Sequence, residues 1–401
     1  MRPFKHTIPF AEALRVTLEA AQPISRTETV ATNDADGRVL ARDVVSAVDV
    51  PGFDRAAMDG YAVRAADTAG AAPGAPRRLT CRSSAFAGEP AGRAVGPGEC
   101  AEIATGAPIP QGADAVVMVE HTERDGDVVY IQEAGTAGQH VGKRAGDLAR
   151  GSIVAHAGQT LTPAGIGAIA AAGVEAVTVY ARPTVALVTT GNEIVEPGTP
   201  LGPGQVYDVN SLTLGALVAR HGGDAVSFSA TGDAIDEIGR ALTDASHHDI
   251  IVFSGGSSVG DRDLVLDVLR ARGEVLFHGI AVKPGKPTAV ALVGRLPVFA
   301  MPGNPTSCLS NGYLLLVPFL RRVARLEAWQ PRVLERPLAH AIRSAADRHQ
   351  FYTVRVMGGQ VEAAFRGSSA ITSMAHADGY IEIPAGTEEI PAGTIVRVTC
   401  F

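Results

Sequence analysis

The chain has 401 residues, of which 46% are hydrophobic and 19% charged, so it can bury several cores and is not disordered as a whole. Its length predicts about two to four domains. A net charge of −7 argues against nucleic acid or an anionic membrane as the main partner, because proteins that bind them usually carry a basic excess. The cysteines lie far apart, and the longest near-apolar stretch, residues 164–174, is too short to span a bilayer. We therefore expect a reduced, cytoplasmic protein.

The first predicted element is a helix over residues 10–21, which ends before Pro23. Residues 44–141 are expected to form a β-rich insertion, because short strand-like pieces alternate there with Gly and Pro. Residues 151–181 hold a turn, the small-residue run PAGIGAIAAAGV and the strand-like AVTVYA. The insertion thus separates the first helix from the rest of the chain.

From residue 182 to residue 323, apolar strand-like runs alternate with amphipathic segments, which predicts a parallel sheet covered on both faces. The predicted helices cover residues 211–221, 234–246, 263–272 and 309–324. The remaining residues, 333–401, read as all-β and predict a separate small barrel or sandwich.

Polar clusters follow three strands of the predicted sheet, at residues 189–193, 232–233 and 254–263. Ligands of such sheets bind beyond the carboxyl ends of the strands. The glycines allow backbone N–H groups to approach a phosphate, and the carboxylates of Glu193, Asp233, Asp261 and Asp263 suit Mg²⁺. The alternative is that the acidic residues only cap helices, which is the commoner role of a single Asp at a helix start. Neither GxGxxG nor GxxxxGK[ST] is present, so a dinucleotide fold or Walker NTPase lacks its fingerprint.

Two later turns contain proline on both sides of polar residues. In VKPGKP, Lys283 and Lys286 are held close by the prolines, which favours an oxyanion between them over a solvated loop. In MPGNPTS, Thr306 or Ser307 either caps the following helix or contributes hydroxyls to the same anion site. The polar turns at residues 54–63 and 105–108 of the insertion suggest no chemistry by their spacing alone.

With these motifs in this order, the sequence resembles the molybdopterin molybdenumtransferase family, also known as the MoeA family and as the E domain of gephyrin. The resemblance runs from about residue 8 to residue 390. The stretch from Pro51 is similar to the family pattern P-x-x-D-x-S-A-M-D-G-Y-A-V. The matching segments are PGFDRAAMDGYAVR, ATGAPIPQGADAVVMVE, TTGNEI, SGGSSVGDRD, VKPGKP and MPGNPTS.

The resemblance implies a multidomain α/β protein that takes adenylylated molybdopterin and molybdate, uses Mg²⁺, and releases AMP and molybdenum cofactor. It implies an elongated homodimer, with each active site between the α/β domain of one subunit and the β-rich insertion of the other. A possible further partner is the adenylyltransferase of the same pathway. The implied domains are a three-layer α/β molybdopterin-binding-like domain with a parallel-type sheet (1–18 with 182–327), a small linking α+β domain (19–48 with 145–181), a β-rich insertion domain (49–144) and a C-terminal β-barrel-like domain (328–401).

The resemblance also implies roles for individual residues. Those assigned to catalysis are Asp59 and Thr105 from the partner subunit, Glu193, Asp233 and Asp263 as Mg²⁺ ligands, and the oxyanion lysines Lys283 and Lys286. Those assigned to substrate binding are Asp147, Gly255, Gly256, Ser258, Pro287, Asn304, Ser307 and the molybdate-binding pair Arg348 and Ser368.

The sequence departs from the family pattern at several positions. Gly142 stands where the pattern has Arg and Gly146 where it has Glu, while Asn192 replaces Asp. The missing arginine is expected to weaken binding of pterin or phosphate unless Lys143 or Arg144 substitutes for it. Two alternatives stay open: an adenylyltransferase, which does not need the insertion or the C-terminal β domain, and a non-catalytic scaffold that binds pterin or a partner.

Overall fold

The computed structural model describes residues 7–232, 234–255 and 263–401. The chain divides into two compact units, which are described separately. One, the α/β unit, comprises residues 1–28 and 180–401, and the other, the inserted unit, comprises residues 29–179. The finer division into four domains stays a prediction. Within the described ranges, no helix has the length and apolar character needed to cross a bilayer.

The α/β unit is built on a six-stranded sheet in the order β16-β13-β17-β21-β20-β18. Strands β16, β13, β17 and β21 are parallel to one another, whereas β20 runs antiparallel to both of its neighbours. The expected parallel-type sheet therefore has one reversed strand. The reason is the short connection from β20 to β21, since a tight turn joins only antiparallel strands. The strands are β13 (Thr184–Thr190), β16 (Asp224–Thr231), β17 (Ile250–Ser254), β18 (Glu274–His278), β20 (Ala289–Val293) and β21 (Leu296–Met301).

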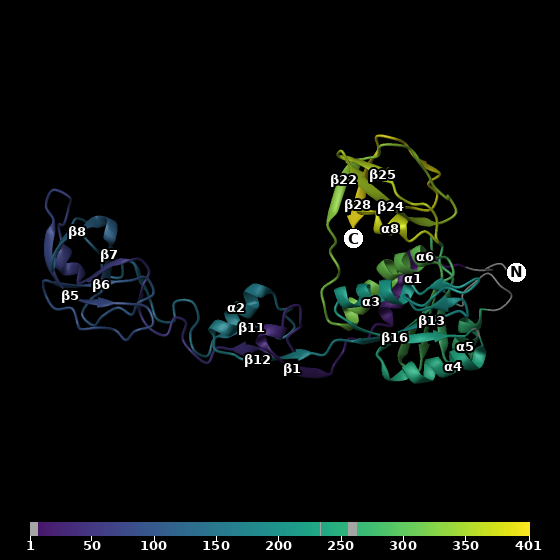
Figure 1. Ribbon diagram of the computed structural model, residues 1–401, viewed down its shortest axis with the longest axis horizontal. Coiled ribbons are helices and arrows are strands. Elements are labelled where there is room, and N and C mark those ends of the chain that lie inside the picture. The colour runs from purple at the N-terminus through teal and green to yellow at the C-terminus, as the bar shows by residue number, and fades with distance from the viewer. Residues whose placement is uncertain (1–6, 233, 256–262) are drawn as a thin grey trace. The chain divides into compact units, whose positions relative to one another are not determined.

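Helices cover both faces of this sheet, so the unit has three layers (Figure 1). Alternate residues of a strand point to opposite faces, and β13 accordingly divides between two cores. Val185 and Leu187 pack with α1, α3, α6 and α7, whereas Ala186 and Val188 pack with α4 and α5. The helices are α1 (Phe10–Glu19), α3 (Asn210–Arg220), α4 (Ile235–Asp244), α5 (Leu264–Arg272), α6 (Pro305–Asn311) and α7 (Val317–Val323), with a π-helical turn, Gly312–Leu316, joining the last two.

The C-terminal part of the α/β unit is all-β apart from one short helix. Its main sheet has the order β19-β24-β26-β28-β22, with β25 paired to β24. Phe351 and Tyr380 of this sheet stack at 3.9 Å between ring centroids and belong to the core of the α/β layers. The elements are β19 (Val282–Lys283), β22 (Val333–Pro337), β23 (Ile342–Arg343), β24 (His349–Met357), β25 (Gln360–Ala363), α8 (Thr372–Ala375), β26 (Gly379–Ile383), β27 (Glu389–Ile390) and β28 (Ile395–Cys400).

The inserted unit contains a six-stranded sheet in the order β7-β4-β6-β5-β9-β8. Its two faces bury separate cores, because Tyr61 and Val63 of β4 point to one side and Ala62 to the other. The described residues 44–141 contain no α-helix, as the sequence pattern indicated. The strands are β3 (Arg55–Ala56), β4 (Gly60–Val63), β5 (Arg77–Ala85), β6 (Glu99–Ile103), β7 (Ala115–Met118), β8 (Thr122–Asp125), β9 (Val128–Ile131) and β10 (Val141–Gly142).

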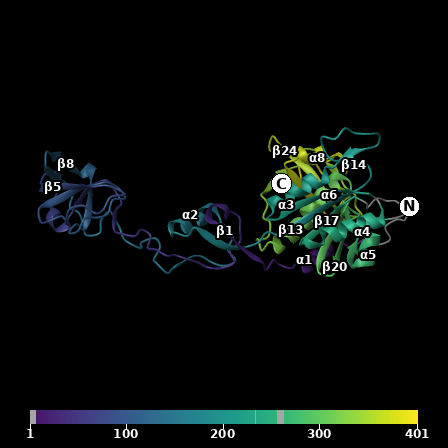
Figure 2. The same ribbon diagram turned by 60° about the horizontal axis from the view of Figure 1, so that its bottom comes forward.

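A smaller α+β region completes the inserted unit, with its own core around Leu40, Leu161 and Ile169. Helix α2 and strand β1 both belong to this region (Figure 2), and α2 contacts β11. Thr162 caps α2 by accepting a hydrogen bond from the Gly165 N–H at 3.2 Å, and Pro163 occupies its first turn. The elements are β1 (Thr27–Ala31), β2 (Val44–Val45), β11 (Ile153–Ala155), α2 (Pro163–Ala171) and β12 (Ala176–Tyr180).

Candidate active site

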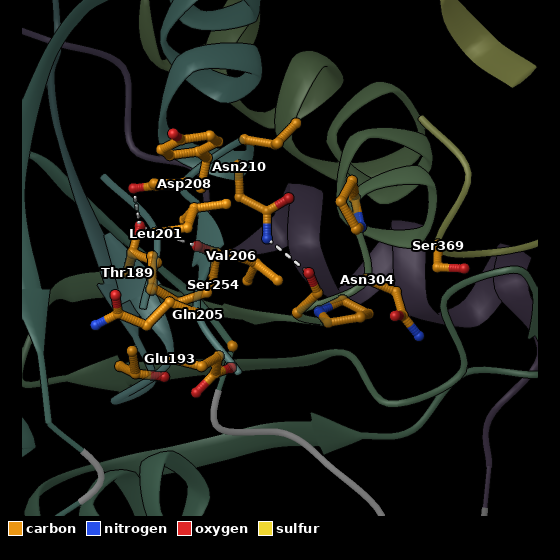
Figure 3. Close-up of a pocket in the computed structure, with 18 of the residues that line it drawn as sticks. Thr189, Glu193, Leu201, Gln205, Val206, Asp208, Asn210, Ser254, Asn304 and Ser369 are labelled. Atoms are coloured by element: carbon orange, nitrogen blue, oxygen red, sulfur yellow. Dashed lines mark hydrogen bonds between the residues drawn. The ribbon is translucent and has the colours of Figure 1, made fainter. Parts of the chain in front are cut away.

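A pocket of about 830 Å³ opens at the carboxyl ends of β13, β17 and β21 in the α/β unit (Figure 3). Its wall is completed by the loop from Glu193 to Asn210, in which β14 (Ile194–Val195) and β15 (Val206–Tyr207) pair in parallel. This is the edge at which parallel sheets bind ligands. Four of the predicted residues line it: Glu193, Gly255, Pro287 and Asn304.

The floor of the pocket is made of closely packed backbone. Gly255 has φ +101°, and a Cβ at this position would lie 2.3 Å from the carbonyl oxygen of Thr190. Its N–H donates to the Met301 carbonyl at 3.2 Å. The ends of three strands are thereby tied together by a residue that must be glycine, since only glycine adopts this conformation without strain and leaves the space empty.

Two polar residues of the pocket wall were missed from the sequence. Asp208 accepts from the Thr189 hydroxyl at 2.8 Å and from the Ser211 N–H at 3.0 Å, so it joins β13 to the start of α3. The Asn210 amide donates to the Gly303 carbonyl at 2.9 Å, as the dashed line in Figure 3 shows. The sequence feature that could have indicated them is the segment VYDVNS, whose polar residues lie at the start of a helix.

The turn that carries the two predicted oxyanion lysines is anchored from beneath by a buried amide. Asn311 of α6 donates to the Gly285 carbonyl at 2.8 Å and to the Thr288 hydroxyl at 2.5 Å. The Lys286 carbonyl accepts from the Ile280 N–H at 3.0 Å. Because the backbone is fixed on both sides, the attachment points of Lys283 and Lys286 are fixed too, while both side chains stay partly exposed.

The C-terminal β region supplies the groups next to this turn. Lys283 of β19 lies opposite Gln350 of β24, two residues after Arg348. Hydrogen bonds from Arg348, and further the positive charge of Lys286, lower the pKa of Asp347. The lysine turn and the predicted molybdate residue Arg348 therefore lie near each other, and Arg348 forms an ion pair with Asp347.

The turn after β21 contacts the same region. The Thr306 N–H donates to the Ser368 carbonyl at 3.1 Å, and the Asn304 amide to the Ser368 hydroxyl at 3.4 Å. The helix begins at Pro305 rather than near residue 309, so neither Thr306 nor Ser307 caps it. The reason is that Pro305 is suited to the first turn of a helix. Ser307 is buried within α6 and does not line the pocket.

The predicted magnesium ligands are only partly described by the structure. Asp263 caps α5 by accepting from the Leu266 N–H at 3.0 Å, and burial raises its pKa. Asp233, Gly256 and Ser258 lie outside the described residues. Among the residues that are described, no three acidic, His or Cys side chains gather as a metal site. The oxygen donors of the pocket, with Glu193 foremost, nevertheless fit Mg²⁺, which commonly binds one or two carboxylates together with substrate phosphates.

In the inserted unit, Asp59 and Thr105 form a compact pair. The Thr105 N–H and hydroxyl both donate to Oδ1 of Asp59, at 2.6 and 2.8 Å. These bonds lower the pKa of Asp59 and keep it ionised. Both residues are exposed, as is Asp147, whose N–H donates to the Val50 carbonyl at 3.0 Å.

The sequence matches three family models in succession. They are the "MoeA N-terminal region (domain I and II)" over residues 8–173, the "Probable molybdopterin binding domain" over 186–322, and the "MoeA C-terminal region (domain IV)" over 335–401. The chain belongs to the MoeA family. The inserted unit thus corresponds to most of the first match, and the pocket of the α/β unit lies mainly in the second.

Relatives within the MoeA family match along nearly the whole chain. Molybdopterin molybdenumtransferase 2 of Mycobacterium tuberculosis is 36% identical over 98% of both chains. Molybdopterin molybdenumtransferase of Haemophilus influenzae is 31% identical over 94% of both. A crystal structure of a molybdopterin biosynthesis MoeA protein from Pyrococcus horikoshii superposes with a TM-score of 0.83 at 30% identity, covering 99% of this chain and 100% of that one.

Proposed function

We propose that this chain is a molybdopterin molybdenumtransferase, which inserts molybdenum from molybdate into adenylylated molybdopterin and releases AMP. The observation that carries the proposal is the pocket, because its wall of oxygen donors includes Pro287, the residue that directly follows Lys286 of the lysine turn, in a chain of the MoeA family. The two substrates need different groups. Molybdate is an oxyanion that cationic side chains bind, and the phosphate of adenylylated molybdopterin needs oxygen donors that can hold Mg²⁺.

The cationic side of the site is proposed to hold molybdate. A tetrahedral dianion is bound best by charged donors placed on several sides of it. Lys283 and Lys286 supply two ammonium groups on a fixed turn, and Arg348 lies two residues before the strand partner of Lys283. Ser368 adds a hydroxyl, which already contacts Asn304 of the pocket wall.

The oxygen-rich wall is proposed to receive the adenylylated end of the substrate. Mg²⁺ would neutralise phosphate charge there when the P–O bond breaks. Glu193 is the pocket carboxylate that fits this ion, with Asp233 and Asp263 as the further predicted ligands. Gly256 and Ser258 are proposed to bring backbone N–H groups to the phosphate. Gly255, whose N–H donates to Met301, is proposed to let the phosphate approach because it has no side chain, and Pro287 and Asn304 are proposed to shape the wall between the two substrates.

We further propose a homodimer in which Asp59 and Thr105 of one subunit complete the pocket of the other. The support is chemical: both residues are exposed, and the hydrogen bonds from Thr105 lower the pKa of Asp59, so an ionised carboxylate is available to a ligand. The proposed cell compartment is the cytoplasm, and the adenylyltransferase that makes the substrate is a proposed partner.

The transferase reaction explains more of the chain than the alternatives do. An adenylyltransferase would leave the inserted unit and the C-terminal β region without a role, although the latter contacts the pocket through Ser368. A scaffold without turnover would not need Glu193 in the pocket or an anchored lysine turn.

The direct test is incubation with adenylylated molybdopterin, molybdate and Mg²⁺. AMP and molybdenum cofactor should form in equal amounts, and AMP release without cofactor would contradict the proposal.

Subunit mixing tests whether the site is shared. Asp59→Ala and Glu193→Ala homodimers should each be inactive. Their mixture should regain about one competent site per heterodimer, because in a shared site both changes fall in the same site and leave the other site unaltered. Mass spectrometry of the intact complexes controls for exchange of subunits. Exchange without recovery of activity would exclude the shared site and leave the reaction itself untouched.

A further inference from the structure

Three segments of the inserted unit lie side by side at the Asp59–Thr105 pair. The Ala56 N–H donates to the Ala107 carbonyl at 2.9 Å, and the Ala57 N–H to the His140 carbonyl at 2.9 Å. Strand β3, Arg55–Ala56, is therefore the middle segment, and it leads directly to Asp59. Arg55 precedes Asp59 by four residues, which span at most about 14 Å of chain.

The two cations that follow Gly142 are already matched by carboxylates. Lys143 Nζ lies 2.9 Å from Asp54 Oδ2, and Arg144 Nε lies 2.7 Å from Asp49 Oδ2. Asp54 also accepts from the Arg144 N–H at 2.8 Å, and these bonds lower its pKa. Neither residue is therefore well placed to stand in for a binding arginine at position 142.

Arg55 differs from both of them. It is exposed, and across residues 7–232, 234–255 and 263–401 no carboxylate forms an ion pair with it. Its position is set by β3, where the neighbouring Ala56 is buried against the core and Arg55 points to the opposite, exposed side. An exposed guanidinium without a matching carboxylate is available to an anion.

Gly142 explains why Arg55 can lie where it does. The two residues are direct partners in the antiparallel pairing of β10 and β3, and such partners carry their side chains on the same face. A Cβ at position 142 would lie 3.4 Å from Cγ of Arg55 and 3.7 Å from its Nε. The arginine stem thus lies over the bare glycine, in the space that a side chain from position 142 would take.

We propose that Arg55 binds the anionic phosphoryl part of the substrate and replaces the arginine that the family pattern has at position 142. The inference rests on the proposed function, since it takes adenylylated molybdopterin as the ligand. Asp59 would accept N–H groups of that substrate while Arg55 meets its negative charge. The two residues are close enough in the chain for one extended ligand to contact both.

Arg55→Gln tests this role in steady-state kinetics. The KM for adenylylated molybdopterin should rise about 10-fold or more, the usual effect of losing a charge-assisted contact, while the dependence on molybdate stays unchanged. Arg78→Gln is the matched control, because Arg78 is an exposed arginine on β5, in the six-stranded sheet of the same unit. Added salt should weaken substrate binding by the unaltered protein more than by Arg55→Gln.

The reciprocal exchange separates binding from a structural effect. Arg55→Asn combined with Gly142→Arg should restore the KM to within about 3-fold, because it moves the guanidinium to the neighbouring strand on the same face. A KM for Arg55→Gln equal to that of Arg78→Gln would overturn the inference while leaving the proposed function standing. So would failure of the double variant to recover in a protein with an unchanged melting temperature. No turnover by the unaltered protein would instead overturn the proposed function, and this inference with it.

Discussion

The two units present functional groups in opposite ways. In the α/β unit, the pocket floor consists of strand ends packed so closely that a Cβ on Gly255 would lie 2.3 Å from a carbonyl oxygen. In the inserted unit, Asp59 and Thr105 lie exposed in turns, next to the start of β4 and the end of β6, outside the buried cores. The geometry of the pocket therefore depends on the packing of the whole α/β unit, whereas the Asp59–Thr105 pair is held by two hydrogen bonds between exposed turns.

Adding one methyl group to a glycine in each unit should give the largest contrast. Gly255→Ala should destabilise the α/β unit by about 2–4 kcal/mol, because it adds a backbone clash to a strained φ. In the inserted unit, Gly106→Ala should cost about 1 kcal/mol, since its φ is also positive but only the Ala87 side chain lies near. Unfolding of the α/β unit can be followed through Trp329, the single tryptophan, and that of the inserted unit through hydrogen exchange. Equal costs would show that the two sites are packed alike.

Removing one lysine from each unit should show which lysine binds molybdate and which only adds charge to the surface. Lys286→Ala should raise the molybdate requirement about 10- to 150-fold, as expected for loss of a charge-assisted contact, with little change in thermal stability. High molybdate should partly restore activity, and Lys286→Arg should rescue poorly because a planar guanidinium does not replace a compact ammonium. Lys143→Ala is the control, since its exposed pair with Asp54 contributes only about 0–1 kcal/mol. An unchanged molybdate dependence in Lys286→Ala would mean that the lysine is merely solvated.

Acidification should affect the α/β unit before the inserted unit. Burial, helped by Arg321 and Arg220, lowers the pKa of His221 to about 4. The unfolded chain therefore takes up a proton near pH 6.5 that the folded state accepts only near pH 4, so stability falls as the pH drops through this window. Between pH 7 and pH 5 the loss should be about 1–2 kcal/mol, measured by urea unfolding with Trp329 fluorescence.

His221→Phe provides the control for this effect, because it keeps an aromatic ring beside Trp329 without a titrating group. Asp263 acts in the opposite sense, since its raised pKa favours the folded state at low pH. In the inserted unit, the carboxylates of Asp49, Asp54 and Asp59 have lowered pKa values, so their stabilisation is lost only below about pH 4. A loss that persists in His221→Phe would assign the pH dependence to another group.

Local patterns in the sequence were enough to predict the layered α/β architecture, the β-rich insertion and the turns that form the pocket. Apolar runs separated by amphipathic segments predict strands covered by helices wherever they occur. Glycine and proline mark turns, because glycine allows a positive φ and proline fixes φ. The helices predicted at 234–246 and 263–272 accordingly lie within one or two residues of α4 and α5. The assignment of Asp263 as a cap or a ligand was open in the sequence, and the cap is seen.

Only the tertiary structure decided which polar groups meet. Asp208 and Asn210 become pocket residues because α3 starts at the edge where β13 and β21 end, and Asn311 anchors the lysine turn from a helix 26 residues away. Arg348 approaches the lysines only because β19 pairs with β24. Likewise, Gly142 looks like a loss in the sequence, while the pairing of β3 and β10 places Arg55 over it. Contacts between distant segments depend on strand order and register, which the residues of one segment do not determine by themselves.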